Sequence, residues 1–174
     1  MQSGHKCLLD KPGNYDIMVI ERGDRMETMT VRIKKLKEEA IMPRYGSEDA
    51  AGADLCALTE EETVLFLPGE TKLIPTGLAI EIPRGFAGFI YARSGIATKR
   101  GLAPANKVGV IDSDYRGEVM VALHNHSDGA QTITRGERIA QLVIAPYLTA
   151  VFAEVDELED TARGEGGFGS TGRK

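Results

Sequence analysis

The chain has 174 residues, long enough for one domain with its own core, and its 42% hydrophobic content argues against global disorder. Its 21 lysines and arginines against 26 aspartates and glutamates give a formal net charge of −5, which disfavours a nucleic-acid partner because phosphate neutralisation needs clustered cations. No apolar run approaches the ~18 residues that a membrane span needs, so we expect a cytoplasmic protein with no membrane or nucleic-acid partner.

Residues 1–30 mix Gly, Pro, Asp and Arg without a sustained hydrophobic period. A segment that buries no apolar face does not offset the conformational entropy lost on ordering it. We therefore expect an N-terminal extension, whose order the sequence leaves open, ahead of a folded domain over residues 31–160.

The segment from residue 31 to about residue 155 carries a β signal throughout. Turn residues such as Pro68-Gly69 and Arg135-Gly136 separate short apolar runs. The run LAIEI (78–82) alternates as a strand with one buried face should. The pattern predicts an all-β fold, a jelly-roll-like barrel or sandwich. The runs lie at residues 64–67, 72–74, 78–82, 86–91, 108–111, 118–123, 141–145 and 151–155.

Only two stretches, residues 36–40 and 94–100, have the composition of a helix, and both are short. With 5 Tyr, 5 Phe and no Trp, the chain is poor in aromatic residues. We therefore expect a core of aliphatic side chains.

The C-terminal residues 161–174 are unusually rich in glycine, and five of the chain's 20 glycines lie between Gly164 and Gly172. Composition alone describes a flexible tail. The segment has the Gly-x-x-x-x-Gly frame of a phosphate loop but lacks the lysine and the following helix, which excludes a P-loop ATPase. Glycine N–H groups together with Arg163 still suit phosphate oxygens. Phe168 has no core to join, which suggests stacking on a flat ligand.

The run VGVI (108–111) leads directly into Asp112, Asp114 and Tyr115. Asp-Ser-Asp are good turn residues, so a plain hairpin turn explains Asp114. The turn does not explain an aromatic residue directly after two acids. A carboxylate at the end of a rigid strand is well placed to orient water, which makes Asp112 a candidate general base.

Three further segments carry polar residues that could contact a ligand. Arg93 and Ser94 end a strand just before a glycine, and a planar cation beside a hydroxyl suits phosphate oxygens. Arg138 and Gln141 lie in GERIAQL (136–142), and Asp54 lies in AAGADLCA (50–57). Taken singly, these last three residues are better explained by structural roles.

The sequence predicts no metal cage built from protein side chains. His124 and His126 lie at strand spacing without a third ligand, so a solvated pair is favoured over a metal site. Cys7 and Cys56 are too few for a disulfide framework and are wrongly spaced for zinc.

Together, five segments resemble in order the five motifs of the homotrimeric deoxyuridine triphosphatases (dUTP pyrophosphatases). They are AAGADLCA, YARSGIA, GVIDSDYRGEV, GERIAQL and RGEGGFGSTG. The resemblance covers about residues 31–174 and implies a β jelly roll that forms a homotrimer with active sites at subunit interfaces. It also implies hydrolysis of dUTP to dUMP and pyrophosphate, aided by Mg²⁺. That reaction keeps uracil out of DNA and supplies dUMP for dTMP synthesis.

The resemblance also assigns roles to individual positions. Asp112 matches the carboxylate that activates the water attacking the α-phosphorus. Tyr115 matches the aromatic residue under the deoxyribose, which leaves no room for a ribose 2′-OH. Uracil would be read, largely by backbone groups, at Asn106, Gly109, Val110 and Ile111. The positions that match phosphate-contacting residues are Ser94, Gly95 and Gln141, with Arg93 beside them.

The C-terminal arm, residues 161–174, matches a segment that closes over a neighbouring subunit's site. Its matched members are Arg163, Phe168 (stacked on uracil), Gly169, Ser170 and Thr171. Asp54, Arg93 and Arg138 carry over as motif members without firmly assigned individual roles. The Mg²⁺ would be held by the triphosphate and by water.

Two other functions stay open. A dCTP deaminase shares the fold, but the glycine-rich arm and Tyr115 favour the hydrolase. A non-catalytic nucleotide-binding module is disfavoured by Asp112 together with an intact arm.

Overall fold

The computed structural model describes residues 28–166, and the compact unit that holds the folded body begins at Val31. Within residues 28–166, no helix is long and apolar enough to cross a membrane. The elements in chain order are β1 (Arg32–Lys35), β2 (Arg44–Tyr45), β3 (Ala53–Cys56), β4 (Thr63–Phe66), β5 (Thr71–Glu81), β6 (Phe86–Ala92), α1 (Ser94–Arg100), β7 (Leu102–Pro104), β8 (Gly109–Ile111), β9 (Glu118–Asn125), β10 (Gln131–Thr134) and β11 (Arg138–Pro146).

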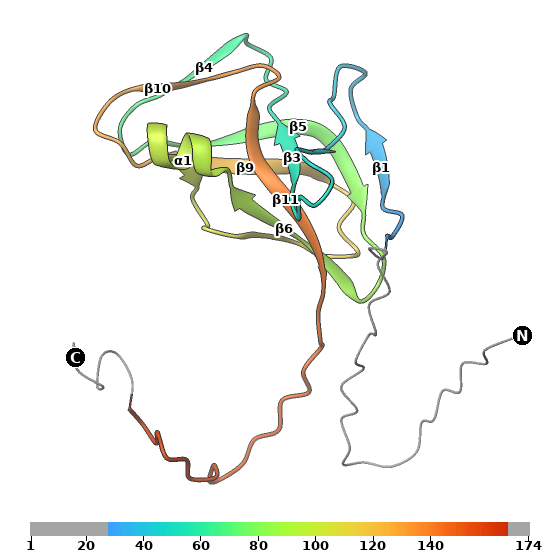
Figure 1. The fold of residues 1–174 in the computed structure, drawn as a ribbon, viewed down its shortest axis with the longest axis vertical. Coiled ribbons are helices and arrows are strands. Elements are labelled where there is room, and N and C mark those ends of the chain that lie inside the picture. The colour runs from blue at the N-terminus through green and yellow to red at the C-terminus, as the bar shows by residue number, and fades with distance from the viewer. Residues whose placement is uncertain (1–27, 167–174) are drawn as a thin grey trace, which may run out of the picture. The chain divides into compact units, whose positions relative to one another are not determined.

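These strands form three open sheets, and neighbouring strands in them are antiparallel (Figure 1). The larger sheets have the strand orders β2-β3-β11-β6-β8 and β1-β5-β9-β7, and β10 pairs with β4 in a two-stranded ribbon. Few neighbours in these orders are consecutive in sequence, so the chain crosses repeatedly between sheets. The architecture confirms the predicted all-β class.

The two larger sheets share one hydrophobic core. Leu55, Ile90 and Leu142 from one sheet join the same buried cluster as Leu78 and Val121 from the other. Burying one such side chain contributes about 1.5–3 kcal/mol relative to leaving it exposed. The core is mainly aliphatic, as expected from the scarcity of aromatic residues, and its largest fully buried members include Phe66, Leu55, Ile74, Leu78, Ile80, Ile82, Leu102, Leu123, Ile133 and Ile139.

Strand β5 contains an irregularity at Gly77. The register with β9 shifts between Pro75 and Ala79, and Gly77 has a φ of +71°. A Cβ at Gly77 would lie 2.4 Å from Leu58 and 2.9 Å from Ala40, so both segments cover the strand there. The runs predicted separately at 72–74 and 78–82 are therefore one strand. The run at residues 78–82 is buried on both faces rather than one, because the segments that contain Ala40 and Leu58 lie over it.

Three sequence-based expectations need correction or addition. Residues 36–40 form a turn rather than a helix, closed by the Ala40 N–H on the carbonyl of Lys37 at 3.1 Å, whereas residues 94–100 are helical as expected. Residues 151–155 form no strand in this chain, where Val151 and Phe152 are 95% and 94% exposed. A strand needs a partner, and no neighbouring strand covers these residues. The apolar-run pattern also omitted β1, β2, β3, β7 and β10.

Candidate active site

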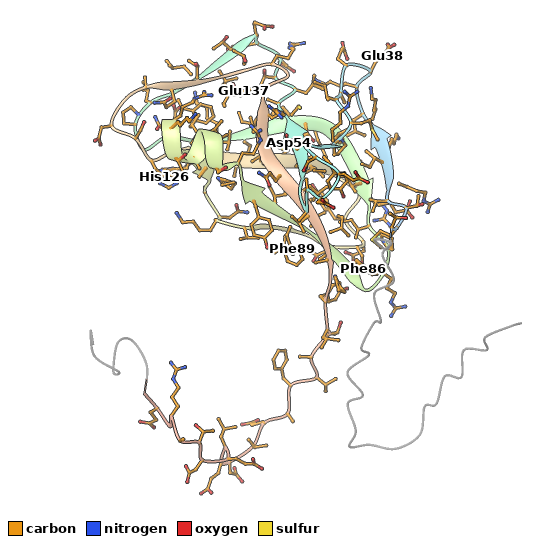
Figure 2. All side chains as sticks on the ribbon, in the orientation of Figure 1. Glu38, Asp54, Phe86, Phe89, His126 and Glu137 are labelled. Carbon is orange, nitrogen blue, oxygen red and sulfur yellow. The ribbon has the colours of Figure 1, made fainter. Side chains whose placement is uncertain are left out.

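Asp54 is the centre of a charged cluster that joins three strand ends. Figure 2 labels Asp54 on the ribbon. Its Oδ1 accepts a hydrogen bond from Arg93 Nε at 2.7 Å, and its Oδ2 accepts one from Arg138 Nη1 at 3.0 Å. Arg93 also donates to the carbonyl of Arg138 at 3.2 Å. The Asp54 side chain is only 12% exposed. Two guanidinium groups around one carboxylate leave a net charge of +1, which suits a bound anion.

Gln141 lies beside this cluster because β11 runs between β3 and β6. It pairs with Asp54 on one side and with Tyr91 on the other. A Cβ at Gly52 would lie 2.8 Å from Gln141 Oε1, so the small residue before β3 makes room for the amide. The structure thus brings together three residues that the sequence takes singly as structural: Asp54, Arg138 and Gln141.

Ser94 and Gly95 begin α1 directly after Arg93 and are exposed. A Cβ at Gly95 would meet no atom within 4 Å, so the space above this backbone is open. The other end of α1 is fixed by Arg100, which pairs with Glu137 and donates to the carbonyl of Thr132. This ion pair links residues that are 37 apart in sequence, and neither residue was singled out from the sequence.

The second group of matched residues lies on β8 and the turn that follows it. The turn is closed by the Tyr115 N–H donating to the carbonyl of Asp112 at 3.1 Å. Asp112 is exposed, and Tyr115 is 46% exposed. Asn106 lies in the preceding loop, where a Cβ at Gly109 would come within 3.3 Å of its Nδ2. Val110 is 61% exposed, whereas Gly109 and Ile111 face inward.

These two groups lie toward opposite ends of β6. The register pairs Gly88 with Ile111 and Ile90 with Gly109, so the chain that continues to Asp112 runs toward the start of β6. Arg93 and Ser94 follow the other end of the same strand. Five residues of extended chain lead from Gly88 to Arg93, and they span a distance of about 17 Å. One chain therefore keeps its own Asp112 far from its own Ser94.

The C-terminal arm is described only in part. Arg163 is exposed, and its Nε donates to the carbonyl of Gly166 at 2.7 Å. The four other predicted arm residues lie outside the described residues: Phe168, Gly169, Ser170 and Thr171.

No cluster of three or more His, Cys, Asp or Glu side chains that could hold a metal occurs in the described part of the chain. The imidazoles of His124 and His126 have centroids 4.3 Å apart, and His124 Nδ1 lies 2.8 Å from Thr71 Oγ1. Desolvation, followed by the nearby His124 and Lys107, lowers the pKa of His126 although its side chain is exposed. The donor set at the candidate site fits a magnesium ion that takes its oxygen ligands from a triphosphate and water, since Asp54 is already occupied by two guanidinium groups.

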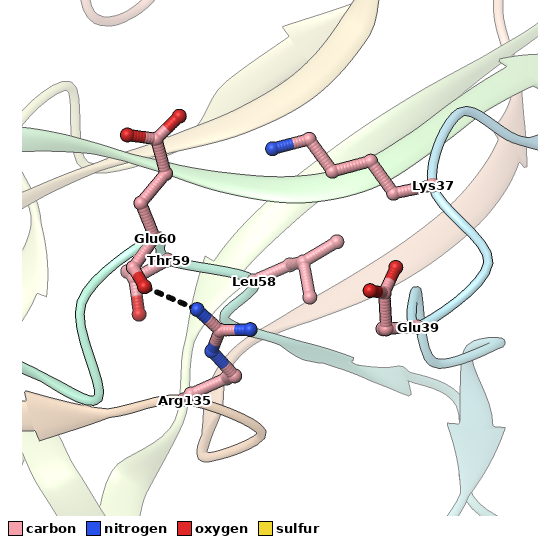
Figure 3. A pocket seen from close by; sticks show the side chains of 6 residues that line it. All are labelled: Lys37, Glu39, Leu58, Thr59, Glu60 and Arg135. Carbon is pink, nitrogen blue, oxygen red and sulfur yellow. Dashed lines mark hydrogen bonds between the residues drawn. The ribbon is translucent and has the colours of Figure 1, made fainter.

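A pocket of about 270 Å³ lies elsewhere, and no predicted site residue lines it (Figure 3). Arg135 lines it and donates a hydrogen bond to the carbonyl of Glu60. The pocket has mixed charge and is lined by Lys37, Glu39, Leu58, Thr59, Glu60 and Arg135. Its lining gives no reason to place the chemistry there.

Comparisons with known proteins identify the family of this chain. A family model described as dUTPase matches residues 38–172. The deoxyuridine 5'-triphosphate nucleotidohydrolase of Nautilia profundicola is 54% identical over 145 residues, which are 83% of this chain and 100% of that protein. The enzyme of the same name from an Anaeromyxobacter species is 49% identical over 148 residues, which are 83% of this chain and 99% of that protein.

Solved structures agree as well. The dUTPase of Staphylococcus bacteriophage 80alpha with dUPNHPP matches with a TM-score of 0.75 and 34% identity, covering 83% of this chain and 99% of the phage chain. A mutant dUTPase from phage phi11 of S. aureus, described for the coordination of a structural Mg(II) ion, matches with a TM-score of 0.68 and 28% identity. That match covers 76% of this chain and all of the phage chain. The family model, the relatives and the solved structures agree, and the chain belongs to the dUTPase family.

Proposed function

We propose that this chain hydrolyses dUTP to dUMP and pyrophosphate by attack of water on the α-phosphorus. The observation that carries the proposal is Asp112, an exposed carboxylate that follows strand β8 and is held in a closed turn with Tyr115. The family match over residues 38–172 includes this turn and the four other motifs.

Asp112 acts as the general base. It accepts a proton from the attacking water while the new oxygen–phosphorus bond forms and the α–β phosphoanhydride bond breaks, which releases pyrophosphate. Rigid placement of the carboxylate favours the reaction, because phosphoryl transfer depends mainly on positioning and charge stabilisation. A divalent cation bound to the triphosphate supplies additional neutralisation of its negative charge.

The phosphates bind at the other group of residues. Ser94 and Gly95 offer a hydroxyl and an open stretch of backbone, and Gln141 adds an amide. Arg93 and Arg138 surround Asp54 with a net positive charge, so the cluster attracts the triphosphate while keeping both guanidinium groups oriented.

The two groups work together across a subunit boundary. The register of β6 with β8 separates Asp112 from Ser94 by more than about 17 Å in one chain, which exceeds the span of a triphosphate. This separation supports a homotrimer in which each active site takes Asp112 from one subunit and Ser94 from its neighbour. The arm over residues 161–174 then closes over the same shared site and excludes water.

Tyr115 sets the choice of sugar in this scheme. Its ring lies under the deoxyribose and leaves no space for a 2′-OH, while the backbone from Asn106 to Ile111 reads uracil. Removal of dUTP keeps uracil out of DNA, and the product dUMP supplies dTMP synthesis.

The test is pyrophosphate release from dUTP compared with dTTP, dCTP and UTP, each with and without Mg²⁺. We expect rapid release from dUTP with Mg²⁺ and little from the other three. Ammonia release from dCTP would point to the deaminase instead. Binding of dUTP without any pyrophosphate would contradict the proposed function.

A further inference from the structure

The side chain of Tyr115 folds back against the backbone of Gly117. A Cβ built on Gly117 would lie 2.4 Å from Tyr115 Oη, 2.7 Å from Cζ and 3.1 Å from Cε2. Real Cβ atoms essentially never come within 3.0 Å of another heavy atom. The ring therefore occupies the space that any larger residue at position 117 would need.

A larger residue at position 117 is opposed by lack of space and not by the backbone conformation. The φ of Gly117 lies outside the left-handed region, so an L-residue fits the backbone there without strain. The Tyr115 ring can give way only as a unit, because its planar atoms move together about two rotatable bonds. A methyl group at position 117 must therefore move the whole ring by about 1 Å to restore ordinary van der Waals contact.

The ring is also held from its hydroxyl end. Tyr115 Oη donates a hydrogen bond to the carbonyl of Glu118 at 3.1 Å. The carboxylate of Glu118 in turn accepts the N–H of Gly77 at 2.7 Å, at the irregularity in β5. The acceptor of the Tyr115 hydroxyl thus belongs to a residue anchored to the neighbouring strand, so the ring position is tied to the body of the sheet.

We propose that Gly117 is a positioning residue that fixes Tyr115 and thereby sets the discrimination between deoxyribose and ribose nucleotides. The inference rests on the proposed function, in which Tyr115 lies under the sugar. A steric filter against one hydroxyl depends on the placement of the ring to within a fraction of an ångström. A methyl group at position 117 displaces the ring from the Glu118 carbonyl and opens space for the 2′-OH.

The experiment compares Gly117→Ala with Gly129→Ala. A Cβ at Gly129 meets no atom within 4 Å and the φ there is also outside the left-handed region, so this variant controls for loss of a glycine. We expect the ratio of kcat/KM for dUTP over UTP to fall by about tenfold or more in Gly117→Ala, the scale of one methyl-sized misfit in a pocket. The ratio in Gly129→Ala stays at the wild-type value. Melting temperatures report whether each variant is folded.

A second pair of variants asks whether Gly117 acts through Tyr115. In a Tyr115→Ala background the ring is gone, so adding Gly117→Ala should leave the dUTP-to-UTP ratio unchanged. If Gly117→Ala does not fold, Tyr115→Phe still tests the anchor, because it removes only the hydroxyl that binds the Glu118 carbonyl. We expect the ratio to fall by about threefold in that variant, on the scale of one lost hydrogen bond.

The outcomes separate this inference from the proposed function. A wild-type protein that releases no pyrophosphate from dUTP overturns the proposed function itself. Wild-type hydrolysis combined with an unchanged sugar ratio in Gly117→Ala overturns only the role of Gly117. A further drop in the ratio on adding Gly117→Ala to Tyr115→Ala would also overturn it, because the effect would then not pass through the ring.

Discussion

Asp54 accepts a hydrogen bond from Arg93 Nε at 2.7 Å, which joins the ends of two strands that do not pair with each other. Strand β11 lies between them and contributes Arg138 to the same carboxylate. The cluster therefore ties β3, β11 and the residue after β6 together at the edge where α1 begins. The cluster thus links three separate segments of the fold, and in the proposed function its net positive charge attracts the triphosphate.

Asp54→Ala should weaken both the fold and nucleotide binding. Removal of the carboxylate leaves two guanidinium groups unpaired, which lowers the free energy of unfolding by about 2 kcal/mol, the scale of hydrogen bonds to charged groups. The KM for dUTP should rise because Arg93 and Arg138 lose their fixed orientation. Denaturant unfolding and steady-state kinetics measure the two effects. Asp49→Ala, at an exposed position, is the control, and equal effects in both variants would contradict a special role for Asp54.

Asp112→Asn should separate binding from chemistry. The amide keeps the size of the carboxylate but accepts no proton, so kcat for dUTP should fall by about 100-fold or more. Affinity for a non-hydrolysable dUTP analogue, measured by calorimetry, should stay within about threefold because the phosphate contacts are unchanged. Asp114→Asn in the same turn is the matched control. Near-normal turnover in Asp112→Asn would remove this residue as the base.

Deletion of residues 163–174 should abolish turnover and leave the assembly intact. The arm supplies Arg163 and Phe168 to the closed site in the proposed scheme, whereas the hydrophobic core lies within residues 40–142. Light scattering measures the assembly and pyrophosphate release measures turnover. A truncated protein that is monomeric yet active would contradict the shared site.

Alkaline pH should destabilise the protein through Cys56. Burial raises the pKa of this thiol above its ordinary value of 9.0. The folded state therefore holds its proton more tightly than the unfolded state, and stability that is fully present below pH 9.0 is lost as the pH rises above it. Unfolding free energies of wild type and Cys56→Ala should be measured from pH 7 to 10. They should converge above about pH 9, because only the wild type has a thiol whose ionisation favours the unfolded state. Parallel curves would show that Cys56 titrates alike in both states.

Much of the fold could be predicted from local sequence. Apolar runs bounded by Gly and Pro turns predict β4, β6, β9 and β11, because each of these strands carries enough apolar side chains of its own. Strand β1 reads RIKK and was missed, since three of its four residues are exposed and its order depends on pairing with β5. The prediction of a strand over residues 151–155 was wrong, because an apolar run forms a strand only where a partner strand is present.

Motif resemblance names the members of the candidate site but does not give their geometry. Motif resemblance names Asp112 and Ser94, yet only the register of β6 with β8 shows that one chain holds them apart. The pairing of Arg100 with Glu137 and the contact of Gly117 with Tyr115 depend on side-chain placement, which residue spacing does not carry.

Mixing two inactive variants tests the central claim most directly, namely that Asp112 and Ser94 of different copies build one dUTP-hydrolysing site. Asp112→Asn and Ser94→Ala are each expected to lose about 100-fold or more in kcat/KM. When the two variants are refolded together in equal amounts, random assembly gives about one site in four that has an intact Asp112 from one chain and an intact Ser94 from the other. We predict recovery of about a quarter of the wild-type rate of pyrophosphate release. A mixture no more active than its two components would contradict the shared site.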